Sequence, residues 1–470
     1  MSAAPPTSTP PLPAELERIL LETDALQEAY LVGGCVRDWF LGLPQKDFDI
    51  EVFGLKYEQL EKALTRWGRV DLVGRSFGVA KLTTQAGHTY DFSLARRDSK
   101  IAAGHKGFTI NFDPGITPEE AAARRDYTIN SLMFSPRKGA LLDYYGGVPD
   151  LKQRILRHTS PAFVEDPLRV LRGMQFAARF NLTTAPETLK LCHSIKDTYR
   201  ELALERVRDE WFKWAAKSLV PARGLQFLRD TGWIEHFPEV QALIGVPQEP
   251  EWHPEGDVFT HTSLCCDAMA RLPAWQQLDE TSRIVYMLAI LAHDFAKPQT
   301  TARALKDGVW RIVSPGHEEA GGPVAEKFLE RIMAPAAIRE RVIPLVMNHL
   351  AHLNPASDRG VRRLAKRLEP ETIEGLCLVI EADHSGRPPK PPGLPKGAKE
   401  LLAKAGELSL QAAAPKPILQ GRDLIARGMS PGKEFGRILE AAFEAQLEGK
   451  FTDHDGALNW LEEATRSPHP

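Results

Sequence analysis

The stretch LVGGCVRDWFLGLPQKDFDIEVFG, residues 31–54, has the pattern of a strand, a glycine turn, a helix and a second strand. The second strand holds two aspartates one residue apart, Asp47 and Asp49. Because side chains alternate across a strand, both carboxylates face one side while Phe48 and Ile50 face the core. Adjacent carboxylates repel each other, so the pattern predicts a cation held between them.

The double glycine forms the other half of this pattern. Gly33 and Gly34 let the backbone approach a ligand closely and turn into a helix whose N-terminus favours anions. Arg37, early in that helix, is placed to reach a phosphate. Taken alone, the glycines fit an ordinary strand-to-helix turn equally well. With Asp47 and Asp49 one helix later, we expect Mg²⁺ that also touches a triphosphate, as in two-metal catalysis.

Three further stretches extend the pattern. In HTYDFSLA, residues 88–95, Asp91 is a candidate third carboxylate from a neighbouring strand, with an edge salt bridge as the alternative. In ARRDYTINSLMF, residues 123–134, Arg124 and Arg125 precede a helix start that Asp126 can cap. In EDPLRVLRGMQFAARF, residues 165–180, we expect Glu165 or Asp166 to cap a helix that has Pro167 in its first turn.

The helix expected after Pro167 carries polar side chains on one stripe. Asp166, Arg169 and Arg172 have the spacing i, i+3 and i+6, and a solvated ion pair is the simplest explanation. The core of this helix is already supplied by Leu168, Val170, Leu171, Met174 and Phe176. A carboxylate acceptor beside a guanidinium donor can instead match the Watson–Crick edge of a base.

Bulk composition is that of an ordinary soluble protein and adds few constraints. The chain has 470 residues, 43% of them hydrophobic and 26% charged, a net charge of −3, and no apolar run long enough to span a membrane. The start, MSAAPPTSTPPLP, resembles a disordered tail and not a signal peptide. Five cysteines without CxxC spacing favour a reducing cytoplasm. Nothing in the sequence fixes the oligomeric state.

Composition and periodicity divide the chain into an α+β head and an almost wholly helical body. The strand-like runs stop near residue 150, and the clustered prolines of SGRPPKPPGLPKGAKE, residues 385–400, predict an extended linker. After this linker we expect two amphipathic helices separated by Gly428 and Pro431. The expected parts are a tail (1–14), a head (15–150), a helical neck (151–250), a histidine-rich domain (251–385), a linker (386–397) and a C-terminal helical module (398–470).

These motifs together resemble the class II, bacterial-type tRNA nucleotidyltransferases, the CCA-adding enzymes of the polymerase-β-like superfamily. GGCVRD, KDFD, RRDYTIN, EDPLRVLR and LERVRDEWFKWA occur in the family's order and approximate spacing. The resemblance implies a head with a small mixed sheet that adds C, C and A to tRNA 3′ ends from CTP and ATP. It implies that Asp47 and Asp49 hold catalytic Mg²⁺. It further implies nucleotide contacts from Gly33, Gly34, Arg37, Arg125, Asp126, Asp166, Arg169 and Arg172.

Some relatives with the same motifs add only part of CCA or polyadenylate RNA. The segment RRDSKIAAGHKGFTINFDPG, residues 96–115, corresponds to the family's flexible loop, which assists the switch from C to A addition. GRSFGVAKL, residues 74–82, lacks the added basic residues that we associate with bacterial poly(A) polymerases. Both features favour full CCA addition. The C-terminal module resembles the family's part that lies along the acceptor arm and elbow of tRNA.

Beyond residue 250 the motifs change to histidines paired with aspartates. His293 and Asp294 end an apolar helix, and His261 begins another at a capping threonine. Imidazole and carboxylate at converging helix ends suit Ni²⁺, Co²⁺ or Mn²⁺ as well as Mg²⁺. A single histidine at a helix end is more often structural. Five such motifs in order favour a second metal site.

This part resembles the HD phosphohydrolase superfamily, and its fusion to the head is similar to the multifunctional CCA proteins of certain bacteria. The resemblance implies His261, His293, Asp294 and Asp383 as core ligands, with His317 and His349 as ligands of a second ion. It implies phosphatase and 2′,3′-cyclic phosphodiesterase activity. The alternatives are a vestigial domain that only binds tRNA, an HD phosphohydrolase with a degenerate head, and a non-catalytic RNA-binding protein.

Overall fold

The computed structural model describes residues 9–45, 47–71, 78–100 and 108–466. It divides into two compact units. The first unit comprises Met1–Trp214 and Arg223–His236, and the second comprises Ala215–Ala222 and Phe237–Pro470. Among the described residues, no helix is long and apolar enough to cross a membrane. We describe each unit by itself.

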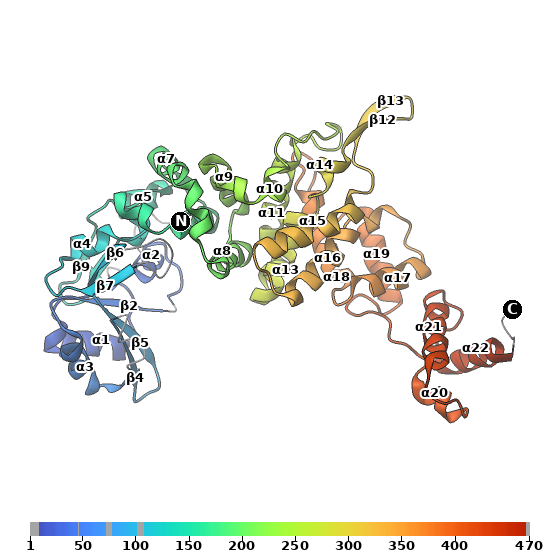
Figure 1. The fold of residues 1–470 in the computed structure, drawn as a ribbon, viewed down its shortest axis with the longest axis horizontal. Helices are drawn as coiled ribbons and strands as arrows, with labels where there is room; N and C mark the ends of the chain where they lie inside the picture. The colour runs from blue at the N-terminus through green and yellow to red at the C-terminus, as the bar shows by residue number, and fades with distance from the viewer. Residues whose placement is uncertain (1–8, 46, 72–77, 101–107, 467–470) are drawn as a thin grey trace. The chain divides into compact units, whose positions relative to one another are not determined.

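A seven-stranded mixed sheet is the centre of the first unit (Figure 1), in agreement with the head expected from the sequence. Its strand order is β3-β4-β5-β2-β1-β8-β9. The strands are β1 (Ala29–Val32), β2 (Asp49–Val52), β3 (Gly68–Asp71), β4 (Val79–Thr84), β5 (Thr89–Leu94), β8 (Met133–Ser135) and β9 (Ala140–Leu142). β2 runs antiparallel to β1 but parallel to β5, with Asp49 paired in register to Asp91.

The order of the sheet follows from the residues that face inward. All four residues of β1 are buried, and β2 buries Ile50, Glu51 and Val52 while leaving Asp49 exposed. A strand buried on both faces belongs at the centre of a sheet, where β1 lies between β2 and β8. β2, which carries Asp49, is therefore fixed in the interior of the sheet, between β5 and the buried strand β1.

Helices surround the sheet and continue beyond it. They are α1 (Ala14–Glu22), α2 (Gly34–Phe40), α3 (Tyr57–Thr65), α4 (Pro118–Ala123), α5 (Gly147–Gln153), α6 (Leu168–Phe180), α7 (Pro186–Ser194), α8 (Leu204–Lys217) and α9 (Pro221–Thr231). A two-stranded parallel pair, β10 (Ile155–Leu156) with β11 (Thr183–Thr184), lies beside α6. The segment 96–115 contains an antiparallel pair, β6 (Arg96–Lys100) with β7 (Phe108–Phe112). The part of the expected flexible loop at 101–107 lies outside the described residues, as do residues 1–8 of the expected tail and residues 72–77, which include the first four residues of the GRSFGVAKL motif.

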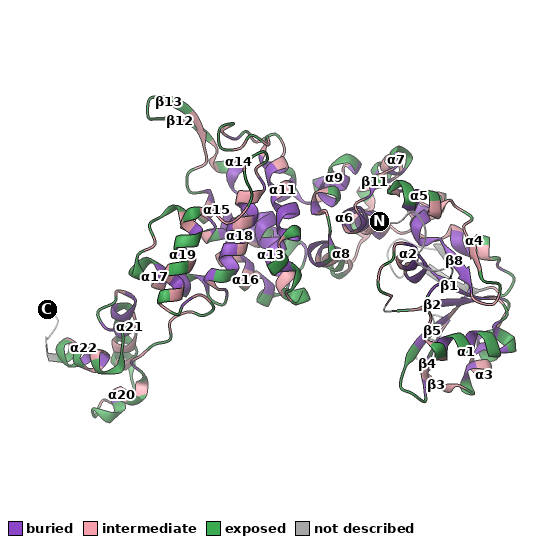
Figure 2. Cartoon of the chain, turned by 180° about the vertical axis from the view of Figure 1, so that it is seen from behind, coloured by how far each residue is buried: buried purple, intermediate pink, exposed green. Residues whose placement is uncertain are grey.

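The second unit is built around one buried helix. Residues 284–292 of α13 (Glu280–Ala292) are all buried, and α11 (Val258–Arg271), α16 (Ala336–Asn348) and α18 (Ile373–Ser385) pack against it. Figure 2 shows these helices with their inner faces buried. The remaining helices are α10 (Pro238–Gln241), α12 (Pro273–Gln276), α14 (Lys297–Thr300), α15 (His317–Arg331), α17 (Asp358–Leu368), α19 (Lys396–Glu407), α20 (Gly421–Ala426), α21 (Lys433–Leu447) and α22 (His454–Arg466).

The body is helical as expected, with one element that was not predicted. This element is an antiparallel hairpin formed by β12 (Ala302–Lys306) and β13 (Val309–Val313). Its turn is Asp307-Gly308, both with positive φ, which is the chemistry of a two-residue hairpin turn. The C-terminal module has three helices, α20 to α22, and not two. Gly428, with φ of +80°, lies in the connection between α20 and α21.

Candidate functional site

Two neighbouring strands, β2 and β5, carry carboxylates at the predicted metal site. Asp49 begins β2, Asp91 is its partner on β5, and Asp47 precedes β2 as an exposed residue. Removal from bulk water raises the pKa of Asp49, and the nearby charges of Asp91 and Asp47 raise it further, against the opposing effect of Arg125. A carboxylate that its neighbours make costly to ionise is relieved by a bound cation. The oxygen donor set fits Mg²⁺.

The double glycine lies at the start of α2, as expected. Gly33 has a φ of +70°, and a Cβ there would come within 2.9 Å of Arg125 Nη1, so only glycine fits without displacing that guanidinium. Arg37 is buried beneath the turn, donates from Nη1 to Asn130 Oδ1 at 2.6 Å, and lies 4.4 Å from the ring centre of Phe180. These contacts fix Arg37 in one position.

The two arginines of RRDYTIN are held by a carboxylate that the sequence analysis did not identify. Glu51 is buried on β2, and its two oxygens accept from Arg124 Nη2 at 2.6 Å and Arg125 Nη2 at 2.9 Å. Burial alone would raise the pKa of Glu51, but these two guanidinium groups hold it below its usual value. The arginines follow α4, with Arg124 as its C-cap, and they precede a short 3-10 helix, Thr128–Asn130, as expected. The N-cap of that helix is Tyr127 and not Asp126.

The first unit has a pocket of about 400 Å³ where these elements meet. Its lining comprises Gly33, Gly34, Arg37, Asp49, Arg125, Asp126, Asn130, Asp166, Arg169, Arg172 and Arg206. Of the residues predicted for this site, Asp47 and the candidate third carboxylate Asp91 lie outside the lining. Arg172 Nε donates to Asp126 Oδ2 at 2.6 Å, and Asn130 donates to the other oxygen at 3.0 Å. Burial alone would raise the pKa of Asp126, but Arg172 and Asn130 hold it below its usual value.

The stripe at the start of α6 does not form the intrahelical ion pair considered above. Asp166 Oδ2 accepts from Arg206 Nη2 of α8 at 3.0 Å. Arg169 donates to two backbone carbonyls, Ala162 at 2.7 Å and Arg124 at 2.6 Å. Asp166 is also not the N-cap, which is Pro167, although its Oδ1 accepts from the Leu168 N–H at 3.1 Å.

Close packing fixes the segment 124–130 against α6. The Tyr127 hydroxyl donates to the Arg169 carbonyl at 2.8 Å, and a Cβ on Gly173 would come within 2.1 Å of that hydroxyl. Gly173 is therefore required by the close approach of the two segments. Asn130 and Arg206 are the pocket residues that the sequence analysis did not select. Both stood within quoted motifs, RRDYTIN and LERVRDEWFKWA, but motif membership alone does not say which side chain turns inward.

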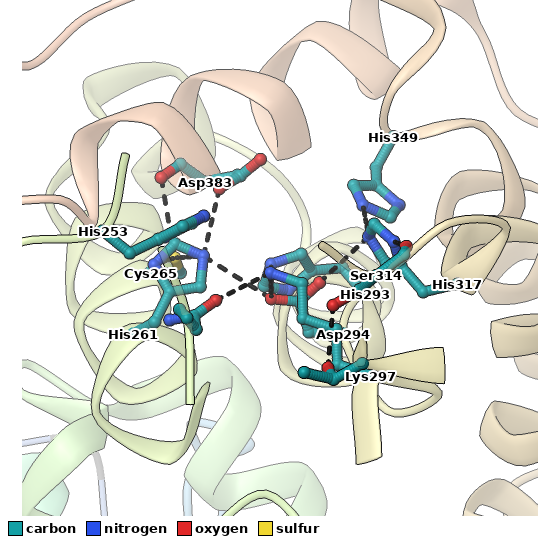
Figure 3. A network of polar contacts seen from close by, with 12 residues as sticks. His253, His261, Cys265, His293, Asp294, Lys297, Ser314, His317, His349 and Asp383 are labelled. Atoms are coloured by element: carbon teal, nitrogen blue, oxygen red, sulfur yellow. Dashed lines mark hydrogen bonds and ion pairs between the residues drawn. The ribbon is translucent and has the colours of Figure 1, made fainter. Parts of the chain in front are cut away.

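In the second unit, the predicted histidines and aspartates converge in the helix core (Figure 3). His261 comes from α11, His293 and Asp294 follow α13, His317 begins α15, His349 follows α16, and Asp383 lies on α18. We call these six residues the histidine cluster. All six are buried. His261 does not begin its helix, because α11 starts three residues earlier at Val258 with Asp257 as its side-chain cap.

Backbone carbonyls fix the orientation of three imidazoles. The Nδ1 atoms of His293, His317 and His349 lie 2.7, 2.6 and 2.7 Å from the carbonyl oxygens of residues 290, 314 and 346. Each Nδ1 therefore carries the hydrogen, and each Nε2 is left with its lone pair. The Nε2 atoms of His317 and His349 nevertheless lie 3.3 Å apart. Two lone pairs that face each other in this way are the arrangement of ligands around a shared cation.

The charges of the cluster agree with a cation site. Burial alone would raise the pKa of Asp294, but His293 and Lys297 hold it well below its usual value, and His261 and Arg387 do the same for Asp383. Burial, with His293 and His317 nearby, lowers the pKa of His349 to about 3. Within the described residues, His293 Nε2 is buried without a hydrogen bond. Burial alone would lower the pKa of His261 and of His317, but Cys265 and Asp383 hold the pKa of His261, and Asp294 that of His317, above the usual value. Imidazole and carboxylate donors side by side fit a divalent transition metal.

Four residues around the cluster were not selected from the sequence. Glu255 Oε1 lies 2.7 Å from His261 Nδ1 and 2.9 Å from His253 Nδ1, and these imidazoles lower the pKa of Glu255 to about 2 against its burial. Lys297 Nζ lies 2.7 Å from Asp294 Oδ2, and Cys265 Sγ lies 3.4 Å from His261 Nε2. A carboxylate behind a ligating histidine fixes its tautomer, so Glu255 leaves His261 Nε2 available for a cation shared with Asp383, whose Oδ1 lies 3.2 Å away.

Solved structures share this fold over nearly the whole chain. The Bacillus stearothermophilus CCA-adding enzyme in complex with CTP matches with a TM-score of 0.62 and 20% identity, covering 97% of this chain and 98% of that one. The Thermotoga maritima CCA-adding enzyme complexed with tRNA matches with a TM-score of 0.56 and 19% identity, covering 93% and 91%. The architecture expected from the resemblance is confirmed by these likenesses.

Sequence comparison is more specific. Residues 29–157 match the model of the poly A polymerase head domain. The multifunctional CCA protein of Xanthomonas campestris pv. campestris is 36% identical over 425 residues, covering 88% of this chain and 96% of that protein. The multifunctional CCA protein of Halorhodospira halophila is 38% identical over 373 residues, covering 77% and 84%. The chain belongs to the family of the multifunctional CCA proteins, which are divalent-metal-dependent tRNA nucleotidyltransferases.

Proposed function

We propose that this chain adds C, C and A in turn to the 3′ end of tRNA, using CTP and ATP without a nucleic-acid template. The observation that carries the proposal is the pocket of the first unit, where the Asp49 carboxylate, the glycine turn and a set of fixed arginines line one cavity. Relatives of this chain are named multifunctional CCA proteins, and solved structures of similar fold hold CTP, ATP or tRNA.

The roles of the residues in nucleotidyl transfer follow from their positions. Asp47 and Asp49 would hold Mg²⁺, which neutralises the triphosphate and lowers the pKa of the attacking 3′-hydroxyl. The oxygen of that hydroxyl forms the new bond to the α-phosphorus, and the bond from this phosphorus to the bridging oxygen breaks, releasing pyrophosphate. Gly33, Gly34 and Arg37 bind phosphate oxygens at the start of α2. Arg125 contacts the triphosphate and sugar.

The choice of base is assigned to the pocket wall formed by α6. Asp166 accepts from, and Arg169 donates to, the Watson–Crick edge of CTP or ATP, while Arg172 stacks on the base or reaches a phosphate. Asp126 positions Arg172 through their 2.6 Å ion pair. Arg206 holds Asp166, and the carbonyls of Ala162 and Arg124 hold Arg169, so both side chains have a set orientation in the pocket wall.

The experiment that tests this proposal supplies tRNA ending before CCA with CTP alone, with ATP alone, and with both. Growth by two C and then one A supports full addition. Addition of A only after a pre-existing CC, addition of CC only, or a long A tail would identify one of the partial or polyadenylating alternatives.

For the second unit we propose a metal-dependent phosphohydrolase that acts as phosphatase and 2′,3′-cyclic phosphodiesterase. The histidine cluster would hold Ni²⁺, Co²⁺, Mn²⁺ or Mg²⁺, which polarises a phosphoryl oxygen and activates water. The water oxygen forms a bond to phosphorus, one phosphorus–oxygen bond to ribose breaks, and that ribose oxygen takes a proton to become a hydroxyl. Lys297 and Arg387 line the same pocket and bind phosphate oxygens.

Separate variants of the two sites distinguish this proposal from its rivals. Asp47→Ala abolishes nucleotide addition and leaves phosphatase activity, whereas Asp294→Ala does the reverse. If the wild type hydrolyses phosphoesters but adds no nucleotide, so that Asp47→Ala leaves its activity intact, the head is degenerate. A protein that incorporates no labelled nucleotide into RNA with Mg²⁺ is a binding protein only.

The chain also divides into parts with separate proposed roles. We assign residues 15–150 to the nucleotidyltransferase head, 151–250 to the neck, 251–385 to an HD domain and 398–470 to a module that contacts the tRNA acceptor arm and elbow. The division at 386–397 is supported by the lack of helix or strand between α18 and residue 395. A cytoplasmic location is supported by the five cysteines, which are all buried and free.

A further inference from the structure

The pocket at the histidine cluster is larger than a phosphate group alone requires. Its volume is about 330 Å³, and five cluster residues line it: His293, Asp294, His317, His349 and Asp383. Pockets of about 300 Å³ and more hold organic ligands, not single oxyanions. Since the metal-ligating side chains occupy one part of the lining, the rest of the pocket is available for the organic part of a phosphoester.

That remaining part contains an exposed indole. Trp252 lines the pocket with 38% of its surface exposed. Lys306 Nζ lies 6.0 Å and the Arg311 guanidinium carbon 5.5 Å from its ring centre. A flat aromatic face beside positive charges is the combination on which single-stranded nucleic acids stack their bases and bind their phosphates.

The wall around Trp252 is a built structure. The hairpin β12–β13 is attached to the segment before Trp252, because Glu249 Oε1 lies 3.1 Å from Arg311 Nη1 and Glu249 Oε2 accepts from the Ile312 N–H at 3.0 Å. Lys306 and Ile312 of the hairpin line the pocket together with Trp252. The hairpin therefore holds a cation and the indole in one wall.

A second cationic group of the pocket lies next to the histidine cluster. Arg387 lines the pocket, with Nη2 4.0 Å from Asp383 Oδ1. Among the described residues, its buried Nε has no hydrogen-bond partner. A guanidinium donor next to the cluster suits a phosphate oxygen of a ligand. The pocket thus offers a phosphate end, at the cluster and Arg387, and a base end, at Trp252.

We propose that Trp252 is a specificity-determining residue of this site, which stacks on the base of an RNA 3′-terminal nucleotide whose cyclic or terminal phosphate lies at the histidine cluster. The assignment rests on the proposed phosphohydrolase function. It makes the substrate a phosphorylated nucleotide end rather than any small phosphoester. Such an end lacks a free 3′-hydroxyl, so its hydrolysis must come before nucleotide addition by the head.

The test measures binding to the full chain loaded with Mn²⁺ by rapid mixing, before the cyclic nucleotide can be hydrolysed. The ligands are adenosine 2′,3′-cyclic phosphate and inorganic phosphate, and the proteins are wild type, Trp252→Ala, Trp252→Phe and Trp310→Ala. Trp310 is the matched control, because it lies on β13 with 68% of its surface exposed and does not line the pocket. Loss of base stacking on Trp252→Ala weakens cyclic nucleotide binding by about fivefold to a hundredfold. Inorganic phosphate binds equally well, and Trp252→Phe retains most of the nucleotide affinity.

Three results overturn the assignment. These are an unchanged nucleotide affinity in Trp252→Ala, an equal loss in Trp310→Ala, and a loss of phosphate affinity as large as the loss of nucleotide affinity. The first two would show that Trp252 does not bind the base, and the third that its role is structural.

Hydrolysis of bis(p-nitrophenyl) phosphate by the wild type separates this assignment from the proposed function. If the wild type hydrolyses this ester and the KM of Trp252→Ala for the cyclic nucleotide is unchanged, the proposed hydrolase function stands and the assignment of Trp252 is wrong. If no phosphoester is hydrolysed with Mn²⁺, Ni²⁺, Co²⁺ or Mg²⁺, the hydrolase is wrong, and the binding comparison still decides the role of Trp252.

Discussion

Arg206 of α8 donates to Asp166 at 3.0 Å, so the residue assigned to recognise the base is held by a helix that follows it by forty positions. Both side chains line the same pocket. Asp166 has one oxygen on Arg206 and the other on the Leu168 N–H, which fixes the plane of the carboxylate. Its direction toward a nucleotide is therefore set from outside α6.

Removal of Arg206 tests this arrangement. In Arg206→Ala, Asp166 loses a charge-assisted hydrogen bond of about 1.5–3 kcal/mol, and its carboxylate is no longer held in one orientation. We expect kcat/KM for CTP and ATP to fall about tenfold or more and misincorporation of UTP and GTP to rise. Arg206→Lys should recover part of the loss. Unchanged discrimination in Arg206→Ala would contradict the assigned role.

Asp49→Asn separates metal binding from folding. The neighbouring carboxylates that raise the pKa of Asp49 also make its charge unfavourable, so the variant should melt at the same temperature as wild type, or higher, in EDTA. Nucleotide addition should fall by a hundredfold or more, on the order of the several kcal/mol that a metal ligand supplies. Calorimetry with and without Mg²⁺ should show a stabilising shift in wild type that is absent in the variant.

Glu51 is expected to act through Arg125. Glu51→Gln leaves two partly buried guanidinium groups without a counter-charge and should lower the free energy of unfolding by about 2–3 kcal/mol, measured in urea. It should also raise the KM for nucleotide, because Arg125 lines the pocket. Glu119→Gln, an exposed change in α4, is the control and should alter neither. A stability loss with an unchanged KM would limit Glu51 to a structural role.

The lowered pKa of Asp126 predicts how the free energy of unfolding depends on pH. Its pKa is lowered in the folded protein relative to about 3.9 in the unfolded chain. A lowered carboxyl pKa contributes stability that is present above the unfolded value and is lost as the pH falls through the folded value. The free energy of unfolding of wild type should therefore fall more steeply below about pH 5 than that of Asp126→Asn. Parallel curves would contradict the Asp126–Arg172 ion pair.

His317→Ala should affect only the second unit. His317 Nε2 lies 3.3 Å from both His349 Nε2 and Asp294 Oδ1, so its loss removes one imidazole ligand. We expect less bound metal per chain by elemental analysis and a large loss of phosphatase activity, with CCA addition unchanged. His236→Ala is the control, because His236 lines neither pocket; its Nε2 lies 2.9 Å from the Lys196 carbonyl oxygen and its ring stacks on Tyr199. Loss of addition in His317→Ala would show that the two activities are coupled.

The sequence identified the residues whose roles depend on local pattern. Asp49, Gly33 and His293 follow from strand alternation, a glycine turn and a helix end, which are properties of a few neighbouring positions. Glu51 stands on the same strand face as Asp49, but its partners are Arg124 and Arg125, more than seventy positions away. The pairing of Glu51 with these arginines depends on how β2 packs against the segment after α4, and no periodicity in the sequence indicates it.

The missed hairpin has a different cause. ARALKDGVWRIV, residues 302–313, contains the DG turn between two β-rich runs, which is a recognised hairpin signal. The sequence on either side of this stretch has a helical pattern, so the whole region was predicted to be helical. Trp252 and Arg387 line one pocket although they are more than a hundred positions apart, and the contact of the hairpin with Glu249 sets one wall of it, so this association could not be predicted from the sequence.

Arg206 is the last residue along the sequence that lines the pocket of the first unit. During synthesis on a ribosome, every side chain of this pocket therefore leaves the exit tunnel before the last histidines and aspartates of the second unit are translated. The first unit needs only the segment 223–236 in addition to complete its contacts. A nascent chain can therefore acquire its nucleotide pocket while the metal site that would prepare the RNA end is still being made.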